Sequence, residues 1–331
     1  MFRLHQRITI GGKVLPFVGD VVLNSSRNNF TATAQITLPN RIAERGKRIS
    51  DVIEQGSAIT IELGYFPNLN VEFEGYISQV MPDRVCTIMC EDEAYIAKRK
   101  SIGKDIIQKA TTIKALIAAC YNGEFECIDA NIGDWKVSKS ATVLDVLSDM
   151  QNKFKVFSYF RGKTLIVGVQ ADTHISQGIT CDFQRNVPLG ESSFSFADVA
   201  ADRVIVKASA INREGVISEV YAYYVNQDIE YSSVAPEVGK INEFNINGQS
   251  DITTDDLRAL ARIRLEALSY MGAEGSIAIF GSPIAAHGDY AVISDSRVPE
   301  KNGRYSIVEV EKSFGANGFR QVLNLGVDYG D

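Results

Sequence analysis

Two distant stretches of the chain share one arrangement of glycine, serine and alternating apolar residues. In the first, EQGSAITIELG (54–64) precedes FEGYISQV (73–80), and in the second AEGSIAIFG (273–281) precedes NGRYSIVEV (302–310). In both, a helical pattern leads into an alternating strand that ends in glycine, and Gly-Tyr or Gly-x-Tyr then opens another strand. The repetition predicts two copies of one β module. Its period and copy number exclude propellers and solenoids.

Residues 1–97 are expected to form the first β domain. RITIGGKVLPF predicts a hairpin with Gly11-Gly12 in the turn. The segments NNFTATAQITLP, SAITIELGY, VEFEGYISQV and RVCTIMCED alternate as half-buried strands do, and a short helix is expected between 41 and 55. Such a run of strands with one short helix predicts an antiparallel barrel or sandwich.

Residues 98–180 are expected to form a small mixed α-β-α-β-β domain. Helical spacing marks 111–121, with threonine caps, and 140–153, with Ser140 as the cap. A hairpin then joins KVFSYF to TLIVGV through Arg161-Gly162-Lys163.

Residues 181–331 are expected to form the second β domain. DRVIVKASA and EVYAYYVN alternate strongly, the polar stretch 231–252 predicts a long loop, and a helix is expected at about 253–270, capped by Thr253 or Thr254. Strands return after Gly272, and the last two are joined by a turn at 315–318.

Composition narrows the class of protein. The 331 residues include 34 Lys and Arg against 41 Asp and Glu, a formal net charge of −7. Nucleic-acid binding depends mainly on basic residues that neutralise phosphates, so this balance disfavours it. No apolar run is long enough to span a bilayer, and the N-terminus lacks the pattern of a signal peptide. We expect a soluble protein made in a cytosol.

The cysteines and histidines predict neither a metal site nor a disulfide framework. The five cysteines are odd in number and contain no C-x-x-C pair, and the three histidines are scattered singly. Cys86 and Cys90 lie on one face of an alternating segment with Ile88 between them, which predicts buried core positions. We expect no metal and no cofactor.

Catalytic motifs of the common kinds are missing from the sequence. There is no G-x-S-x-G, H-E-x-x-H, Walker or G-x-G-x-x-G pattern. A Ser-His-Asp triad assembled in space stays open, although His287 in AAHGDY is typical of a turn. The carboxylates Glu91-Asp92-Glu93 precede a basic run and indicate a solvated loop, and Asp255-Asp256 suit a helix N-terminus. We therefore predict no enzyme and no catalytic residue.

The strand and turn segments resemble those of the baseplate hub proteins of contractile phage tails, the late control protein D or 43-kDa tail protein family. Related modules form the hub part of type VI secretion spike proteins. The resembling segments are NNFTATAQITLP, ITIELGY with FEGYISQV, IAIFGSPIAAHGDYAVISD, GRYSIVEVEKSF and FRQVLNLG, so the resemblance covers about 20–100 and 195–326 best. Its motif positions are structural rather than catalytic: Gly64, Tyr65, Gly75, Tyr76, Gly281, Gly288, Asp289, Gly303, Tyr305 and Gly326.

The resemblance implies a mainly β fold in which two tail-tube-like antiparallel domains flank a small α+β domain. It also implies a homotrimeric virion structural protein, from a phage or a prophage, with six similar modules in a ring. That ring would connect the six-fold tail tube to the three-fold spike in the baseplate, after assembly in the bacterial host cytoplasm. The implied partners are further copies of the chain, the tube protein, the spike protein and other baseplate proteins. DNA or cargo would pass through the lumen without specific binding, and no membrane insertion is implied.

Two features of the family's larger members are missing after the last strand. The chain carries no lysozyme-like module and no glycine-valine repeat or metal-binding needle tip. We therefore expect cell-wall cleavage and membrane piercing to belong to other chains. Two alternatives stay open: a cell-wall-degrading tail enzyme with the middle domain as its lid, and a tail module that binds a carbohydrate or receptor. The sequence does not separate a phage from a prophage or a secretion system.

Overall fold

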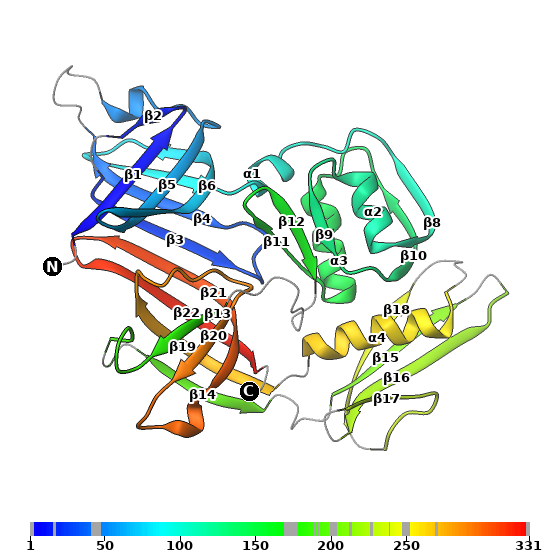
Figure 1. Cartoon of the computed structure of the whole chain (residues 1–331). Helices are drawn as coiled ribbons and strands as arrows, with labels where there is room; N and C mark the ends of the chain where they lie inside the picture. The colour runs from blue at the N-terminus through cyan, green and yellow to red at the C-terminus, as the bar shows by residue number, and fades with distance from the viewer. Residues whose placement is uncertain are drawn as a thin grey trace.

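In a computed structural model the chain folds mainly as β-sheet, with few helices (Figure 1). The structure describes residues 3–15, 18–40, 48–168, 178–188, 190, 192–198, 204–211, 214–225, 228–237, 239–246, 252–268 and 271–328. The largest sheet has 13 strands and contains two units of six strands each. The predicted fold class, mainly β with a smaller α+β part, is confirmed.

The first β unit comes from the N-terminal part of the chain. Its strands are β1 (Leu4–Ile10), β3 (Asp20–Ser26), β4 (Thr33–Pro39), β5 (Ala58–Tyr65), β6 (Asn68–Met81) and β7 (Val85–Glu91). They lie in the order β1-β5-β6-β7-β4-β3, and every neighbouring pair is antiparallel. A two-residue strand β2 (Lys13–Val14) pairs with β1 across Gly11-Gly12, as the hairpin prediction requires.

The second β unit comes mostly from the C-terminal part. Its strands are β13 (Gly178–Asp182), β14 (Ser193–Asp198), β19 (Met271–Phe280), β20 (Tyr290–Ser294), β21 (Gly303–Gly315) and β22 (Gly318–Asp328). Their order is β13-β20-β21-β22-β19-β14. A one-turn helix η3 (Pro299–Lys301) precedes β21. The predicted turn between the last two strands is confirmed, since Gly315 pairs with Gly318.

The two units have the same topology. When the strands of each unit are numbered along the chain, both sheets have the order 1-4-5-6-3-2. The one difference lies in the first pair, which is antiparallel between β1 and β5 and parallel between β13 and β20. The sequence repeat aligned β6 with β21 correctly. It aligned β5 with β19, which is wrong, since the strand that holds the place of β5 in the second unit is β20. The error arose because glycine is common at strand ends, so a terminal glycine does not identify a particular strand.

Each β unit has its own apolar core, and all six of its strands contribute. Ile8, Leu23, Ile36, Ile61, Ile77 and Ile88 represent the first core, and Cys181, Phe194, Ile277, Ile293, Ile307 and Leu323 represent the second. Cys86 and Cys90 are buried in the first core on the same face as Ile88, as predicted. Burial raises the pKa of Cys90 to about 12, which keeps that thiol protonated and unreactive.

The middle segment packs beside the first unit. It contains α1 (Ala94–Ala97), β8 (Ile106–Thr112), α2 (Ile113–Cys120), β9 (Phe125–Cys127), β10 (Asn131–Val137), α3 (Val143–Phe154), β11 (Phe157–Arg161) and β12 (Thr164–Gly168). The predicted hairpin of β11 and β12 is confirmed, with Arg161 opposite Thr164. Two strands are additions to the predicted α-β-α-β-β order: β8 precedes α2, and two strands, β9 and β10, lie between α2 and α3 where one was expected.

Helix caps are partly as predicted. Thr112 caps α2 by accepting a hydrogen bond from the Ala115 amide. The cap predicted at Ser140 is wrong, because Thr142 accepts from the Asp145 amide at 3.2 Å while the Asp145 carboxylate accepts from the Thr142 amide at 2.8 Å. An acidic residue three positions after Thr142 completes this reciprocal cap.

A second correction concerns residues 204–268. Strands β15 (Val204–Ile211), β16 (Ile217–Val225), β17 (Asp228–Ser232) and β18 (Lys240–Ile246) form a separate sheet under α4 (Thr254–Leu268). The prediction of a long loop at 231–252 is therefore wrong in two places: β17 extends to Ser232, and Lys240–Ile246 form β18. Only alternate residues of β18, Phe244 and Ile246, face the core, so its composition is polar.

Residues 204–268 fall within the expected second domain but share a core with the middle segment. The rings of Phe154 in α3 and Phe244 meet edge-on with their centroids 6.4 Å apart. The Arg264 guanidinium donates a hydrogen bond to the Lys153 carbonyl at 2.6 Å. Thr253 caps α4 by accepting from the Asp256 amide at 3.2 Å, as predicted.

Between β4 and β5, only a single helical turn, η1 (Ile49–Asp51), lies in the described part of the predicted 41–55 helix. Residues 41–47 of that prediction lie outside the described residues. Among the described helices, none has the length and apolar character needed to cross a membrane.

Candidate functional site at the seam between the β units

The two β units join through one strand pair. Glu309–Phe314 of β21 pair antiparallel with Val21–Ser26 of β3, which merges both units into one sheet. Phe314 and Phe319, from the second unit, lie in the core of the first. Backbone hydrogen bonds and shared apolar burial thus hold this junction, which we call the seam.

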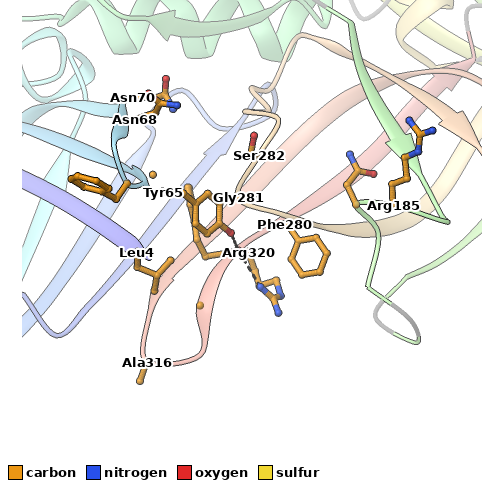
Figure 2. Close-up of a pocket in the computed structure, with 15 residues that line it drawn as sticks. Leu4, Tyr65, Asn68, Asn70, Arg185, Phe280, Gly281, Ser282, Ala316 and Arg320 are labelled. Carbon is orange, nitrogen blue, oxygen red and sulfur yellow. Dashed lines mark hydrogen bonds between the residues drawn. The ribbon is translucent and has the colours of Figure 1, made fainter. Parts of the chain in front are cut away.

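One end of the seam is hollowed into a groove of about 790 Å³ (Figure 2). It lies where the β5–β6 turn, the end of β19 and the β21–β22 turn come together. The lining residues are Leu4, Gly64, Tyr65, Phe66, Asn68, Asn70, Arg185, Asn186, Phe280, Gly281, Ser282, Ala316, Gly318, Phe319 and Arg320.

Aromatic rings and one guanidinium form the centre of the groove. The Arg320 guanidinium lies 4.6 Å from the centre of the Phe280 ring, and Arg320 donates to the Phe319 carbonyl at 3.2 Å. The Tyr65 hydroxyl donates to the same carbonyl at 3.3 Å. Figure 2 shows Tyr65 and Arg320 pointing toward one another from opposite units. A side chain at Gly281 would collide with the Phe319 ring, so the close approach requires glycine there.

A buried glutamine fixes the wall of the groove. Gln321 is fully buried, and its amide nitrogen donates to the carbonyls of Phe280 at 3.0 Å and Pro283 at 2.7 Å. Its amide oxygen accepts from the Ala285 amide at 3.0 Å. These three bonds hold the segment after β19 in one conformation.

The charge of the groove differs from that of the whole chain. Among the described residues, its lining contains two arginines and no acidic residue, although the chain carries a net charge of −7. Arg185 is 84% exposed and makes a loose 3.5 Å ion pair with Asp182, which does not line the groove.

A second polar cluster joins the middle segment to the second β unit. Arg161, at the end of β11, pairs with the Asp289 carboxylate at 3.1 Å and donates to the His287 carbonyl at 3.2 Å. The His287 ring is buried and meets the Tyr159 ring edge-on, with the two ring centroids 4.6 Å apart. Burial, with Arg161 nearby, lowers the pKa of His287 to about 3, so the ring is neutral.

A buried ion pair lies beside this cluster. Glu72 occupies a β-bulge of β6, where Ile61 pairs with Phe73 and Glu62 with Val71. Its carboxylate contacts the Lys312 ammonium of β21, and both side chains are almost completely buried. Burial raises the pKa of Glu72, and Lys312 opposes that rise. The pair ties the counterpart strands of the two units together.

The structure distributes the ten motif residues among several places. Gly64, Tyr65 and Gly281 line the groove, whereas Gly288 and Asp289 lie under Arg161. The remaining five are strand residues outside both places: Gly75 and Tyr76 in β6, Gly303 and Tyr305 in β21, and Gly326 in β22. Tyr305 is fully buried, and its hydroxyl donates to the Lys301 carbonyl at 3.3 Å.

Phe319, Arg320 and Gln321 were not among the predicted motif residues, although they begin the resembling segment FRQVLNLG just after the predicted final turn. Arg161 was predicted only as part of a hairpin turn, and no special role was predicted for Glu72 or Lys312. These three residues come together only through pairing of distant strands.

The carboxylates considered as catalytic candidates are held in structural contacts. Asp92 is buried and accepts from the amides of Ala32 and Ala94, each at 3.1 Å, which corrects its prediction as part of a solvated loop. Burial raises the pKa of Asp92 to about 7. Glu91 pairs with Lys98 at 2.6 Å.

The other candidate pair lies at the start of α4. Asp255 pairs with Arg258 at 2.9 Å, and Asp256 completes the helix cap. Among the described residues, no group of three or more His, Cys, Asp or Glu side chains has an arrangement that suits a metal ion.

Comparisons with known proteins identify the fold. No protein-family model and no curated protein sequence matches the chain. Among solved structures, it is similar to the 43 kDa tail protein of prophage MuSo2 from Shewanella oneidensis, with 14% identity, 97% of each chain covered and a TM-score of 0.61. A tail protein from Neisseria meningitidis MC58 matches at 12% identity over 97% of this chain and 96% of that one, with a TM-score of 0.66.

A type VI secretion component of E. coli is also similar. It has 9% identity over 98% of this chain and 77% of that one, with a TM-score of 0.57, and is described as structurally similar to bacteriophage T4 tail proteins. The chain thus has the fold of phage tail and type VI secretion proteins, and the resemblance seen in the sequence is confirmed at the level of the fold.

Proposed function

We propose that this protein is a structural baseplate hub of a contractile injection machine and works as a homotrimeric ring with pseudo-six-fold symmetry. The observation that carries the proposal is the repeated 1-4-5-6-3-2 strand order within one chain. Three chains with two like units each present six like units around an axis. Such a ring can match a six-fold tube on one side and a three-fold spike on the other.

The seam inside the chain supplies a template for contacts between chains. Strand β3, at the edge of the first unit, is covered by β21 of the second. Its counterpart β14 has no second partner strand in the described part of the chain, and the counterpart of β21 is β6. Pairing β14 of one chain with the β6–β7 end of the next would repeat the seam.

Repeating that contact head to tail closes the ring after three copies. A closed heterologous ring covers the edge strand β14 of every chain, which would otherwise be open to aggregation. Two apolar side chains lie at the β6–β7 end, Met81 with 39% of its surface exposed and Val85 with 51%. An obligate interface on the order of 2,000 Å² or more is expected at each contact.

The proposed partners are the tail tube, the spike and other baseplate proteins, in a tail assembled in the host cytoplasm. Support comes from the folds of the tail and secretion proteins that the chain resembles. DNA or cargo would cross the ring without specific binding, in keeping with a net charge of −7 that repels phosphate. The proposal includes no catalytic step, because Asp92, Glu91 and Asp256 serve structural contacts.

The test blocks the contact between chains and leaves the seam within each chain intact. In the double variant Met81→Lys/Val85→Lys, the new charges would have to be buried at the ring contact, so sedimentation velocity is expected to show monomers. Val234→Lys is the matched control, because Val234 is 71% exposed and lies between β17 and β18. Equal trimer fractions in the double variant and the control would refute the proposed contact.

A further inference from the structure

We propose that the segment Ile77–Met81 of β6 is an acceptor edge for strand β14 of a second copy of the chain, and that the Gln55 side chain occupies this edge until that strand binds. The inference rests on the proposed ring for the identity of the partner. It goes beyond the ring by fixing the residue register of the contact and by giving Gln55 a role in it.

Strands β6 and β21 are equivalent down to single backbone hydrogen bonds. Ile307 of β21 exchanges two backbone bonds with residues 288–289, which precede β20, both at 2.8 Å. Ile77 of β6 exchanges two with residues 56–57, which precede β5, at 2.8 and 3.0 Å. Ile77 therefore holds the place of Ile307.

A β-bulge follows these bonds at the same place in both strands. The register with the next strand shifts between Ile77 and Gln79 in β6 and between Ile307 and Glu309 in β21. In the described part of the chain, Tyr76 is the last residue of β6 that pairs with β5. From Glu309 onward β21 pairs with β3, so the residues from Gln79 onward are the matching edge of β6.

Gln55 makes at this edge the bond that a partner strand makes at the seam. The Val308 carbonyl accepts from the backbone amide of Arg27, directly after β3, at 2.9 Å. The counterpart of Val308 is Ser78, whose carbonyl accepts from the side-chain amide of Gln55 at 2.8 Å. Gln55 is exposed, so its side chain can leave when a strand arrives. A side chain that satisfies an edge carbonyl also protects the edge from unspecific pairing.

The pairing across the two units fixes the register of the incoming strand. Each unit contains a row of four residues that pair in turn across neighbouring strands, Gln79-Met89-Gln35-Val22 in the first and Glu309-Asn324-Ser276-Ser193 in the second. Ser193 of β14 therefore holds the place of Val22 of β3. Val22 pairs with Ser313, four positions after Glu309, which places Ser193 opposite Asp83, four positions after Gln79. Antiparallel pairing then places Ser195 opposite Met81.

Burial agrees with this register. Ser195 is exposed and Met81 is 39% exposed, so both positions lie on the solvent face of their strands. Val80 packs against the first core, and Phe194 is buried in the second. A slip by one residue would place the exposed Ser195 opposite Val80 and bring a solvent face over a core face.

Disulfide trapping in the full chain tests the register. Within one chain six strands lie between β14 and β6, at opposite ends of the large sheet (Figure 1), so a bond between them links two chains. Directly opposite residues of paired strands have Cβ atoms roughly 4.5–5.5 Å apart, close to disulfide distance, whereas diagonal neighbours are about 7–8 Å apart. In a glutathione redox buffer, Met81→Cys/Ser195→Cys is expected to give covalent dimers and trimers on a non-reducing gel.

Two controls accompany the trapping. Met81→Cys/Ser193→Cys is two residues out of register and is expected to give at least tenfold less covalent product. The wild type, with its five native cysteines, measures the background. Equal yields from the two double variants, or a yield at background from both, would overturn the register.

Gln55→Ala tests the role of the side chain at the edge. Because docking of β14 must break the bond between Gln55 and Ser78, the variant should assemble more readily than the wild type. The concentration of half-assembly in a sedimentation-velocity dilution series is expected to fall at least threefold. Asn122→Ala, which removes an exposed amide side chain from the middle segment, should leave it unchanged. An equal or higher concentration for Gln55→Ala would overturn the role of Gln55.

The failure of this inference differs from the failure of the proposed function. A monomeric mass of the wild-type chain refutes the ring and, with it, a second copy at this edge. A trimeric mass with equal trapping in and out of register refutes the register and retains the ring.

Discussion

The ammonium group of Lys312 in β21 contacts the carboxylate of Glu72 in β6, and these two strands hold the same place in the two β units. The contact thus joins counterpart strands of the repeated fold. It lies beside the seam, where Glu309–Phe314 pair with β3. One Glu72 oxygen is buried without a hydrogen-bond partner, so the carboxylate depends on Lys312 for its compensation.

Replacing Lys312 with Met is expected to destabilise the protein by about 3–5 kcal/mol, because a buried carboxylate loses its counter-charge. The loss is measured as the free energy of unfolding in urea. The double variant Glu72→Leu/Lys312→Met removes both charges and should recover most of it. A loss below about 1 kcal/mol in the single variant would show that the ion pair does not hold the units together.

Asp92 should make the protein less stable as the pH rises from about 4 to 7. Burial raises its pKa in the folded state to about 7, whereas the ordinary value is 3.8, so the folded protein binds a proton that the unfolded chain releases. The Asp92→Asn variant should show a smaller fall in unfolding free energy between pH 5 and pH 8 than the wild type. Parallel pH profiles of the two proteins would contradict the assignment.

His287 should make the protein less stable as the pH falls from 6.5 toward 3. Its folded-state pKa of about 3 lies below the ordinary 6.5, so the unfolded chain binds the proton more readily. The stability contributed by the neutral ring is therefore present above pH 6.5 and is lost as the pH falls toward 3. In His287→Phe, which keeps an aromatic ring against Tyr159, the unfolding free energy should fall less between pH 6.5 and pH 4. An unchanged acid slope would show that His287 is not held neutral.

The Gln321→Leu variant is expected to lower the free energy of unfolding by about 2–4 kcal/mol, because the buried amide of Ala285 and the partly buried carbonyls of Phe280 and Pro283 lose their partner. Hydrogen exchange should accelerate at the Ala285 amide, which Gln321 accepts from in the wild type. The exposed substitution Gln79→Leu serves as the control, with an expected change within about 0.5 kcal/mol. Unchanged exchange at Ala285 would contradict the anchoring role.

Alternation in the sequence predicted most strands of both β units, because one buried face imposes a period of two. Strand β18 was missed because only Phe244 and Ile246 face its core and the other residues are polar. The cap at Thr142 was missed because Ser140 precedes the same apolar stripe, and the reciprocal bond with Asp145 decided the helix start.

The groove and the buried polar contacts depend on tertiary structure. Glu72 faces inward because of a β-bulge, and no local pattern marks a bulge at that position. Arg161 meets Asp289 across 128 positions of sequence, so neither residue predicts the other. The repeat in the sequence indicated duplication correctly, but strand pairing was needed to show which strands correspond.

The most direct test of the trimeric hub is the molar mass of the purified wild-type chain by light scattering at low micromolar concentration. Three copies of a 36.4 kDa chain predict about 109 kDa. A stable species of 36.4 kDa would contradict the account, because a single chain offers two β units where a ring requires six.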